Sequence, residues 1–377
     1  MFYRFSFFVL FVALCFQNVI LFYLNSIPVK PYHLVLFFVC LFNAKSILLI
    51  PRNCFWILIL VLISFILSFF SFLLYSFSLN PFLLNYIFCC ILLVFVSNAS
   101  NYLDENAFFK VLKKSVIIIY FICLINILLQ IDRIFSFVLN PIGHPLIEVI
   151  FGGGVNLEAT YLGIFATIFK NDKKKIFIYI LSVLISCVYA SRVGLVIDIL
   201  VGLFLFYGHL KKFLFLYLSL FLSVITVLLD LSFIQYIFNR FVSIGNEPGS
   251  ISRIRLWSYF MDTVSNYPFG VGLGNCTSVI SMVTGDFLYE NNFHNLYMQM
   301  FIDLGVIGGL VFVSFCLCFI FINRKTLFSN CFLFIIFIYL LFSFIQFRGA
   351  EPIIFFFIGC YYSIKRNAKQ FDLVSAD

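Results

Sequence analysis

Charged side chains are scarce in this chain. Only 11% of its 377 residues are Asp, Glu, Lys or Arg, whereas 63% are hydrophobic and the mean hydropathy is +1.12. Soluble domains carry about 25% charged residues, so this composition excludes a protein solvated on all sides. The formal net charge of +8 would suggest an anionic partner for a soluble protein. In this chain the excess of basic residues mostly reflects membrane topology, and nucleic acid is not an expected partner.

The chain also lacks the spacings that metal centres and disulfide frameworks need. It has 12 cysteines but no Cys-x-x-Cys pair, and most of them lie within apolar runs, where a thiol packs as a small hydrophobic group. No spacing of carboxylates demands general acid and base roles, and no Ser-His-Asp set is evident. We therefore expect no disulfide, no metal and no other cofactor.

No small-x-small cleavage site follows the first apolar run, so we expect that run to be retained. Apolar runs of about 17 to 24 residues recur, each long enough to cross a hydrocarbon core of about 30 Å. The fold expected is an all-α polytopic membrane protein with about 12 transmembrane helices and one large outer loop. The predicted spans are 5–24, 33–50, 54–77, 81–99, 112–131, 155–169, 175–190, 193–207, 213–229, 295–322, 331–347 and 352–364.

These spans divide the chain into four parts. Residues 1–229 form a nine-helix transmembrane region, 230–293 the large outer loop with an interfacial helix, 294–364 three further transmembrane helices, and 365–377 a cytoplasmic tail. An even number of spans puts both termini on one side. With the N and C termini cytoplasmic, the inner side holds 17 of the 24 basic residues, as the positive-inside rule requires.

The basic residues on the two sides differ in kind. Thirteen of the 17 inner residues are lysine, whereas the outer ones are Lys30 and six arginines. A guanidinium binds phosphate through a planar pair of donors and stays charged in a half-dry site, so outer arginines are candidates for binding a phosphorylated ligand. The alternative is pairing with an outer acid. For Arg133 and Arg348, each close to an acid in the sequence, the two interpretations are balanced.

Arg192 lies in a sharp outer turn beside Gly194, with no acid nearby in the sequence. Its side chain either extends to lipid headgroups or reaches into a site. Asp198, about a turn and a half farther along the next span, is a candidate partner. Glu158, just inside the span 155–169, is costly in lipid and indicates a polar cavity or an arginine partner.

The outer loop contains a predicted amphipathic helix from Ser252, as N-cap, to about Asn266. Its apolar side, which includes Leu256 and Phe260, is expected at the membrane interface with Trp257 among the headgroups. The run 270–274, Gly-Val-Gly-Leu-Gly, follows no strand and is therefore not a nucleotide fingerprint. It predicts a tight turn with close backbone approach and amides directed at an anion.

Residues 291–309 pass from a polar loop into an apolar helix without a break. His294, a titratable imidazole, is expected at the water–lipid boundary, and Asn295, Gln299 and Asp303 follow it on one helical face. Gly305 and Gly309 form a small-xxx-small pair, which lets a neighbouring helix approach closely. This combination is unusual for a helix whose only task is to span.

The pattern His294-Asn295, nine residues, Gly305, two residues, Gly308 resembles the signature helix of the O-antigen ligase and O-antigen polymerase (Wzy-type) family. The runs Arg253-Ile-Arg255-Leu-Trp257 and Tyr267-Pro-Phe-Gly-Val-Gly-Leu-Gly-Asn275 look like the family's large periplasmic loop, and Ser191-Arg192-Val-Gly194 fits it as well. The resemblance covers roughly residues 191–310.

The resemblance implies a fold like that of C-type glycosyltransferases and a metal-independent transfer of glycan from a lipid diphosphate outside the bacterial inner membrane. His294 would then be the general base, whereas its alternative role is to cap the helix start. Arg192, Arg253 and Arg255 would bind the diphosphate. The second-tier candidates are Glu158, Asn295 and Asp303.

Two enzymes of this family share that chemistry. A polymerase transfers undecaprenyl-diphosphate-linked glycan onto the next lipid-linked repeat unit, and a ligase transfers finished glycan onto lipid A–core. We favour the polymerase, because polymerases vary more in sequence and a Phe- and Lys-rich chain of this size resembles those of polysaccharide gene clusters. A flippase is a third interpretation, but no repeat between halves is visible. The expected partners are the undecaprenyl-diphosphate-linked oligosaccharide, membrane lipid and a chain-length regulator.

Overall fold

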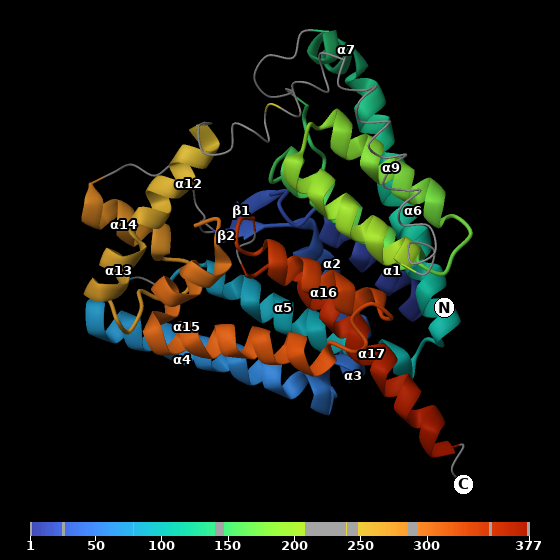
Figure 1. Ribbon diagram of the computed structural model, residues 1–377. Coiled ribbons are helices and arrows are strands. Elements are labelled where there is room, and N and C mark those ends of the chain that lie inside the picture. The colour runs from blue at the N-terminus through green and yellow to red at the C-terminus, as the bar shows by residue number, and fades with distance from the viewer. Residues whose placement is uncertain are drawn as a thin grey trace. The chain divides into compact units, whose positions relative to one another are not determined.

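A computed structural model describes residues 2–24, 27–77, 79–139, 147–207, 239, 248–285, 293–346 and 349–374 (Figure 1). The chain forms two compact units, one comprising residues 1–108 and 248–377, the other residues 109–247. We refer to them as the first and second units. The fold is mostly helical, as predicted, with one short β-hairpin in the first unit.

The first unit begins with a helix, a hairpin and four further α-helices. Their bounds are α1 Phe2–Cys15, β1 Phe22–Leu24, β2 Ile27–Val29, α2 Pro31–Phe42, α3 Ala44–Leu48, α4 Phe55–Tyr75 and α5 Phe82–Ser97, with short 3-10 turns at Arg52–Cys54 and Ala99–Asn101. After residue 247 it continues with α12 Pro248–Ser258, α13 Phe260–Asn266, α14 Cys276–Thr284, α15 Leu296–Asn323, α16 Cys331–Phe342 and α17 Pro352–Val374.

The second unit contains most of α6 (Glu105–Leu129), followed by α7 (Ile131–Leu139), α8 (Val155–Ala166) and the 3-10 turn Thr167–Phe169. These are followed by α9 (Lys175–Val188) and a helix over residues 192–207. The predicted span 213–229 lies outside the described residues.

The predicted first span is wrong beyond residue 15. Helix α1 ends at Cys15, and the chain then turns into an antiparallel hairpin in which Phe22 pairs with Val29. Polar residues at the helix end explain the stop: Gln17 is buried, and its side-chain oxygen accepts the Ile353 amide at 3.3 Å. The second predicted span is also interrupted, because Asn43 separates α2 from α3.

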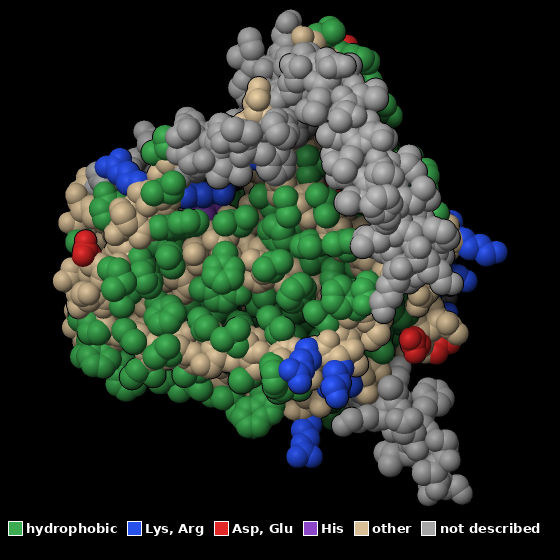
Figure 2. All heavy atoms as spheres, viewed as in Figure 1, with side chains coloured by type: hydrophobic (Ala, Val, Ile, Leu, Met, Phe, Trp, Pro, Cys, Tyr) green, Lys and Arg blue, Asp and Glu red, His purple; other side chains and the backbone are tan. Residues whose placement is uncertain are grey.

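Four helices in the described part of the chain are long and apolar enough to cross a membrane: Arg52–Tyr75, Phe82–Asn101, Glu105–Leu129 and Leu296–Asn323. Figure 2 shows hydrophobic side chains covering the face formed by α15, α16 and α17, with basic side chains gathered near its margins. Leu317 and Phe321 of α15, for example, expose 62% and 63% of their surface. Apolar exposure on this scale is expected of helices solvated by lipid.

Helices α4 and α15 lie side by side, and α5 packs on α17 (Figure 1). Most of the surface of α4 is apolar, but one face carries the buried residues Ser64, Ser68 and Ser71. Their spacing puts them on one helical side. This serine face contacts the glycine-rich turn over residues 267–275, through Ser68 and Ser71.

Candidate functional site

Helix α15 is broken at Gly305, which has φ 74° and ψ −179°. The ring centroids of Tyr297 and Phe312 lie 6.2 Å apart, although fifteen residues of straight helix would separate them by about 22 Å. The chain therefore reverses at Gly305, and a short helix over 296–304 folds back on the longer helix over 306–323. The predicted continuous span over 295–322 is wrong for this reason.

The glycine-rich turn docks against this break. Ile302 and Asp303 carbonyls accept the Val271 and Gly272 amides at 3.0 and 2.8 Å, and the Val306 amide donates to Pro268 at 3.0 Å. A Cβ on Gly270 would collide with the backbone of residues 303–305, so only glycine fits there. The predicted close backbone approach is confirmed.

The serine face of α4 holds the same turn from the other side. The Leu273 amide donates to the Ser68 hydroxyl at 3.0 Å. Asn80, just before α5, donates to the Gly274 carbonyl at 2.8 Å and to the Asn275 side chain at 3.2 Å. The turn is thus fixed between α4, α5 and the break in α15.

The anion at the turn's amides is the chain's own Asp303. This residue has no exposed surface; its Oδ2 accepts the Gly274 amide at 3.0 Å and its Oδ1 accepts the Cys276 amide at 3.1 Å. Cys276 begins α14, so the carboxylate also caps a helix N-terminus. Gln299 donates to Asp303 at 3.3 Å. Asp303 therefore anchors the loop to α15, and among the amides of the predicted run 270–274 the Gly274 amide is occupied by this side chain.

Asn295 is the N-cap of α15, with its side-chain oxygen accepting the Met298 amide at 3.1 Å. His294 precedes it in the left-handed region with φ 56°, and its side chain is half-buried. This conformation is uncommon for residues other than glycine, although histidine adopts it more often than most, and such positions cluster at functional sites.

Trp257 connects His294 to the arginine-bearing helix. Its indole Nε1 donates to the carbonyl of Phe293 at 3.0 Å. Arg253 lies one helical turn before Trp257 on the same side of α12 and is half-buried, whereas Arg255 is exposed. The structure thus holds the helix that carries both arginines against the segment that carries His294, within the first unit.

The apolar side of α12 and α13 packs inside the first unit. Leu256 is buried in a cluster with Phe293 and Ile302, and Phe260 packs against that cluster. The face expected at the membrane interface therefore faces protein, while Ile251 and Ile254 are 52% and 54% exposed. The helix also begins four residues before the predicted Ser252, at Pro248.

Arg192 and Glu158 lie in the second unit. Arg192 is half-buried and opens the helix 192–207. Glu158 has no exposed surface, and its partners are the Tyr189 hydroxyl at 2.6 Å and the Phe151 amide at 3.0 Å, with the Cys123 thiol at 3.7 Å. These polar partners compensate for the cost of burying a carboxyl group.

Asp198 uses a serine rather than the predicted arginine. Its Oδ1 accepts the Ser182 hydroxyl at 2.7 Å, and its Oδ2 is buried without a hydrogen-bond partner. Ser182 lies on α9, so this bond joins α9 to the helix that Arg192 opens. Asp198 therefore links two helices of the second unit.

Residues 176–313 match the sequence model of a protein family described as O-antigen ligase. The family resemblance is confirmed. No curated protein matches the chain. The O-antigen ligase match begins in α9 and ends in α15, so it includes Arg192, Arg253, Arg255 and His294 together with the glycine-rich turn. Glu158 lies before it.

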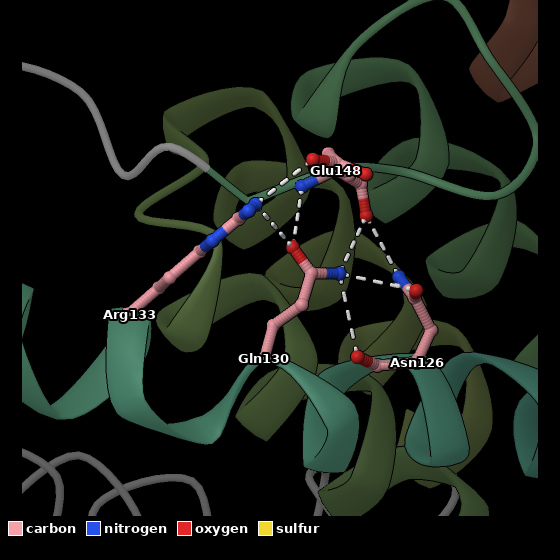
Figure 3. A network of polar contacts seen from close by, with 4 residues as sticks. All are labelled: Asn126, Gln130, Arg133 and Glu148. Atoms are coloured by element: carbon pink, nitrogen blue, oxygen red, sulfur yellow. Dashed lines mark hydrogen bonds and ion pairs between the residues drawn. The ribbon is translucent and has the colours of Figure 1, made fainter.

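Arg133, outside the O-antigen ligase match, is engaged by an acid. Its guanidinium contacts the Glu148 carboxylate at 2.9 Å, and Figure 3 shows Gln130 and Asn126 beside the pair. Gln130 accepts the Glu148 amide at 2.8 Å and donates to the Glu148 carbonyl at 3.0 Å. The acid-pairing interpretation is thus confirmed for Arg133. Arg348, Arg240 and His144 lie outside the described residues.

A small cavity lies beside the short helix of the O-antigen ligase region. Leu296, two residues after His294, is one of its lining residues, and the others include residues of α4, α15, α16 and α17. Its lining is almost entirely apolar, with Phe312, Phe315 and Phe355 among the contributing side chains. Such a lining suits a hydrocarbon chain and no polar ligand.

The sequence reasoning missed three contacts of the candidate residues, one in the first unit and two in the second. They are made by Trp257 with Phe293, by Tyr189 with Glu158, and by Asn156, whose side chain accepts the Ser191 hydroxyl at 2.8 Å. Asn156 and Glu158 share one turn of α8, two residues apart. The sequence did contain a sign of the contacts of Asn156 and Glu158, because two polar residues in the first turn of an otherwise apolar helix are unusual.

Proposed function

We propose that this chain is a polymerase of O-antigen or another surface polysaccharide. It transfers undecaprenyl-diphosphate-linked glycan onto the next lipid-linked repeat unit at the periplasmic face of the inner membrane, with both termini cytoplasmic. The observation that carries the proposal is the bond from Trp257 to the Phe293 carbonyl, because it joins the helix of Arg253 and Arg255 to the segment of His294. The match to the O-antigen ligase family supports it.

In the proposed reaction an acceptor hydroxyl loses its proton to His294, and its oxygen attacks the anomeric carbon of the donor sugar. The bond from that carbon to the diphosphate oxygen breaks, and the diphosphate leaves with the electron pair. General base catalysis contributes typically about 10²- to 10⁴-fold in rate. Arg192, Arg253 and Arg255 stabilise the charge of the leaving diphosphate, by analogy about 10²- to 10³-fold for each donor lost.

The lipid part of the donor enters the membrane at the water–lipid boundary where His294 is expected. The apolar cavity that Leu296 helps to line supports a substrate with a hydrocarbon chain. A chain-length regulator is a further proposed partner. No metal or other cofactor takes part in the proposed chemistry, since the leaving group is already a diphosphate.

A ligase that transfers glycan onto lipid A–core is the second candidate. The description of the matching family favours it. The two enzymes differ in the acceptor and share the donor, so the same arginines and the same histidine would serve both.

The test is surface-glycan analysis by gel in a strain that lacks the gene and carries either the wild type or His294→Ala. Core with a single repeat unit and no ladder indicates a polymerase that needs His294. Bare core with long lipid-linked chains left unattached indicates the ligase. Arg133→Gln is the matched control, because Arg133 is engaged by Glu148 and should retain the wild-type ladder. An unchanged ladder with His294→Ala removes the general-base role of His294. An unchanged ladder in the strain that lacks the gene contradicts both enzymes and returns the flippase to consideration.

A further inference from the structure

The turn that carries Arg192 is fixed from one side by Glu158. The carboxyl group accepts the Tyr189 hydroxyl at 2.6 Å through Oε1 and the Phe151 amide at 3.0 Å through Oε2. Tyr189 is the C-cap residue of α9, three positions before Arg192, and is fully buried. All these residues belong to the second unit.

Asn156, from the same turn of α8, fixes the other side of Arg192. Its Oδ1 accepts the Ser191 hydroxyl at 2.8 Å, and that hydroxyl in turn accepts the Gly194 amide at 3.1 Å. A Cβ added to Gly194 would lie 2.6 Å from the Cβ of Ala159, so α8 and the turn are in direct contact. Residues 156–159 therefore contact the chain immediately before and after Arg192.

The backbone between these two attachments is in an unfavourable conformation. Ala190 has φ 46°, in the left-handed region that alanine rarely adopts. A residue stays in such a conformation only when its surroundings over-determine it. The bonds to Tyr189 and Ser191, on either side of Ala190, supply that constraint.

We propose that Glu158 and Asn156 are positioning residues for Arg192. They hold the left-handed turn so that the guanidinium is presented to the diphosphate of the lipid-linked donor. Glu158 has no exposed surface, so it acts through Tyr189 and does not touch the substrate. This inference rests on the proposed function, in which Arg192 binds the diphosphate.

The experiment measures polymer formation by the purified full-length protein in proteoliposomes, with undecaprenyl-diphosphate-linked oligosaccharide as substrate. The variants are Glu158→Gln, Tyr189→Phe, Arg192→Ala and each of the first two combined with Arg192→Ala. Glu158→Gln and Tyr189→Phe are expected to lower kcat/KM for the donor about tenfold, chiefly through a higher KM. In the Arg192→Ala background they should have no further effect, because residues that act as a unit are non-additive.

Glu351→Gln is the matched control, since Glu351 is also a buried glutamate that accepts a tyrosine hydroxyl and a backbone amide, in the other unit. Its effect should multiply with that of Arg192→Ala. If Glu158→Gln unfolds the protein, the apolar pair Glu158→Met with Tyr189→Phe replaces it, because removing both partners avoids a tyrosine hydroxyl without an acceptor.

Three results are possible. A loss with Arg192→Ala that Glu158→Gln does not deepen supports the proposal. The second result is a loss of activity with Arg192→Ala while Glu158→Gln and Tyr189→Phe either keep the wild-type kcat/KM or multiply the effect of Arg192→Ala. That result overturns the positioning role and leaves the proposed function intact. Wild-type activity of Arg192→Ala removes Arg192 from the proposed function and the positioning role with it.

Discussion

Two buried glutamates, one in each unit, have the same kinds of partner. Glu158 accepts a tyrosine hydroxyl and a backbone amide with separate oxygens, whereas Glu351 receives the Tyr339 hydroxyl and the Gly349 amide, the latter at 2.8 Å, on the same Oε2. Both lie in apolar surroundings, where a carboxyl group is costly unless it is hydrogen-bonded.

The two glutamates hold chain segments next to different candidate site residues. Glu158 adjoins the turn of Arg192, as described above. Tyr339 lies on α16, whose Leu340 and Ser343 carbonyls accept the Tyr297 hydroxyl and the Leu296 amide, both at 2.7 Å. These bonds fix the start of α15 directly after His294. Under the proposed function, Glu158 would then serve donor binding and Glu351 proton transfer.

Replacing His294 should have the largest effect. We expect His294→Gly to lower the polymerisation rate about 10²- to 10⁴-fold, the usual contribution of a general base. Glycine accepts the φ of 56° without strain, so the fold should persist while the imidazole is lost. The measurement is the rate of polymer formation in proteoliposomes.

A helix-capping role for His294 predicts the opposite pattern. His294→Gly would then retain the rate and change only the thermal midpoint. Asn295→Ala is the matched variant, because it removes the N-cap bond to Met298 and leaves the imidazole in place.

Glu351→Gln tests the second half of the comparison and should have a smaller effect, about tenfold. It should lower kcat with little change in the KM for the donor, because the proposed role of His294 is to take the acceptor proton. Steady-state kinetics at several donor concentrations separate the two parameters. A raised KM with unchanged kcat would assign Glu351 to donor binding and remove the distinction between the two glutamates.

The sequence predicted the helices well where an apolar run had no polar interruption, because crossing hydrocarbon requires about 20 such residues. It failed at Gly305, since a glycine within an apolar run equally favours close helix packing, and the reversal depends on the turn 267–275 docking there. The partners of Asp303 and Glu158 were also beyond prediction. Hydrogen bonds to residues 27 to 31 positions away depend on how the helices pack.

Asp303 extends the comparison to a buried acid that accepts hydrogen bonds from two backbone amides and from Gln299. Asp303→Asn would place an NH₂ group against one of the two amide donors and leave that amide without an acceptor. The cost should be about 1–3 kcal/mol of stability, measured as a lower thermal midpoint in detergent. Ser68→Ala, which removes one bond to the same turn, should cost less. An unchanged midpoint for Asp303→Asn would show that the carboxylate does not anchor the turn.

The smallest effect is expected at an ion pair that is partly exposed. Lys113 donates to Asp172 at 2.8 Å, and the two side chains are 24% and 25% exposed. This hydrogen bond from Lys113, with another from the Lys174 amide, lowers the pKa of Asp172 below its usual value. A lowered folded-state pKa contributes stability above the unfolded pKa of about 3.9, and the contribution is lost as the pH falls through the folded pKa.

Asp172→Asn should therefore reduce stability at pH 7 by less than about 1 kcal/mol and flatten its decline below about pH 5. Thermal unfolding followed by circular dichroism between pH 7 and pH 3 measures both changes. Glu148→Gln is the control, because its pair with Arg133 leaves the side chains 54% and 79% exposed and so contributes less. An equal loss of stability in both variants would mean that the difference in burial does not determine how much each ion pair contributes. The contrast between exposed ion pairs and the buried glutamates would then need another physical basis.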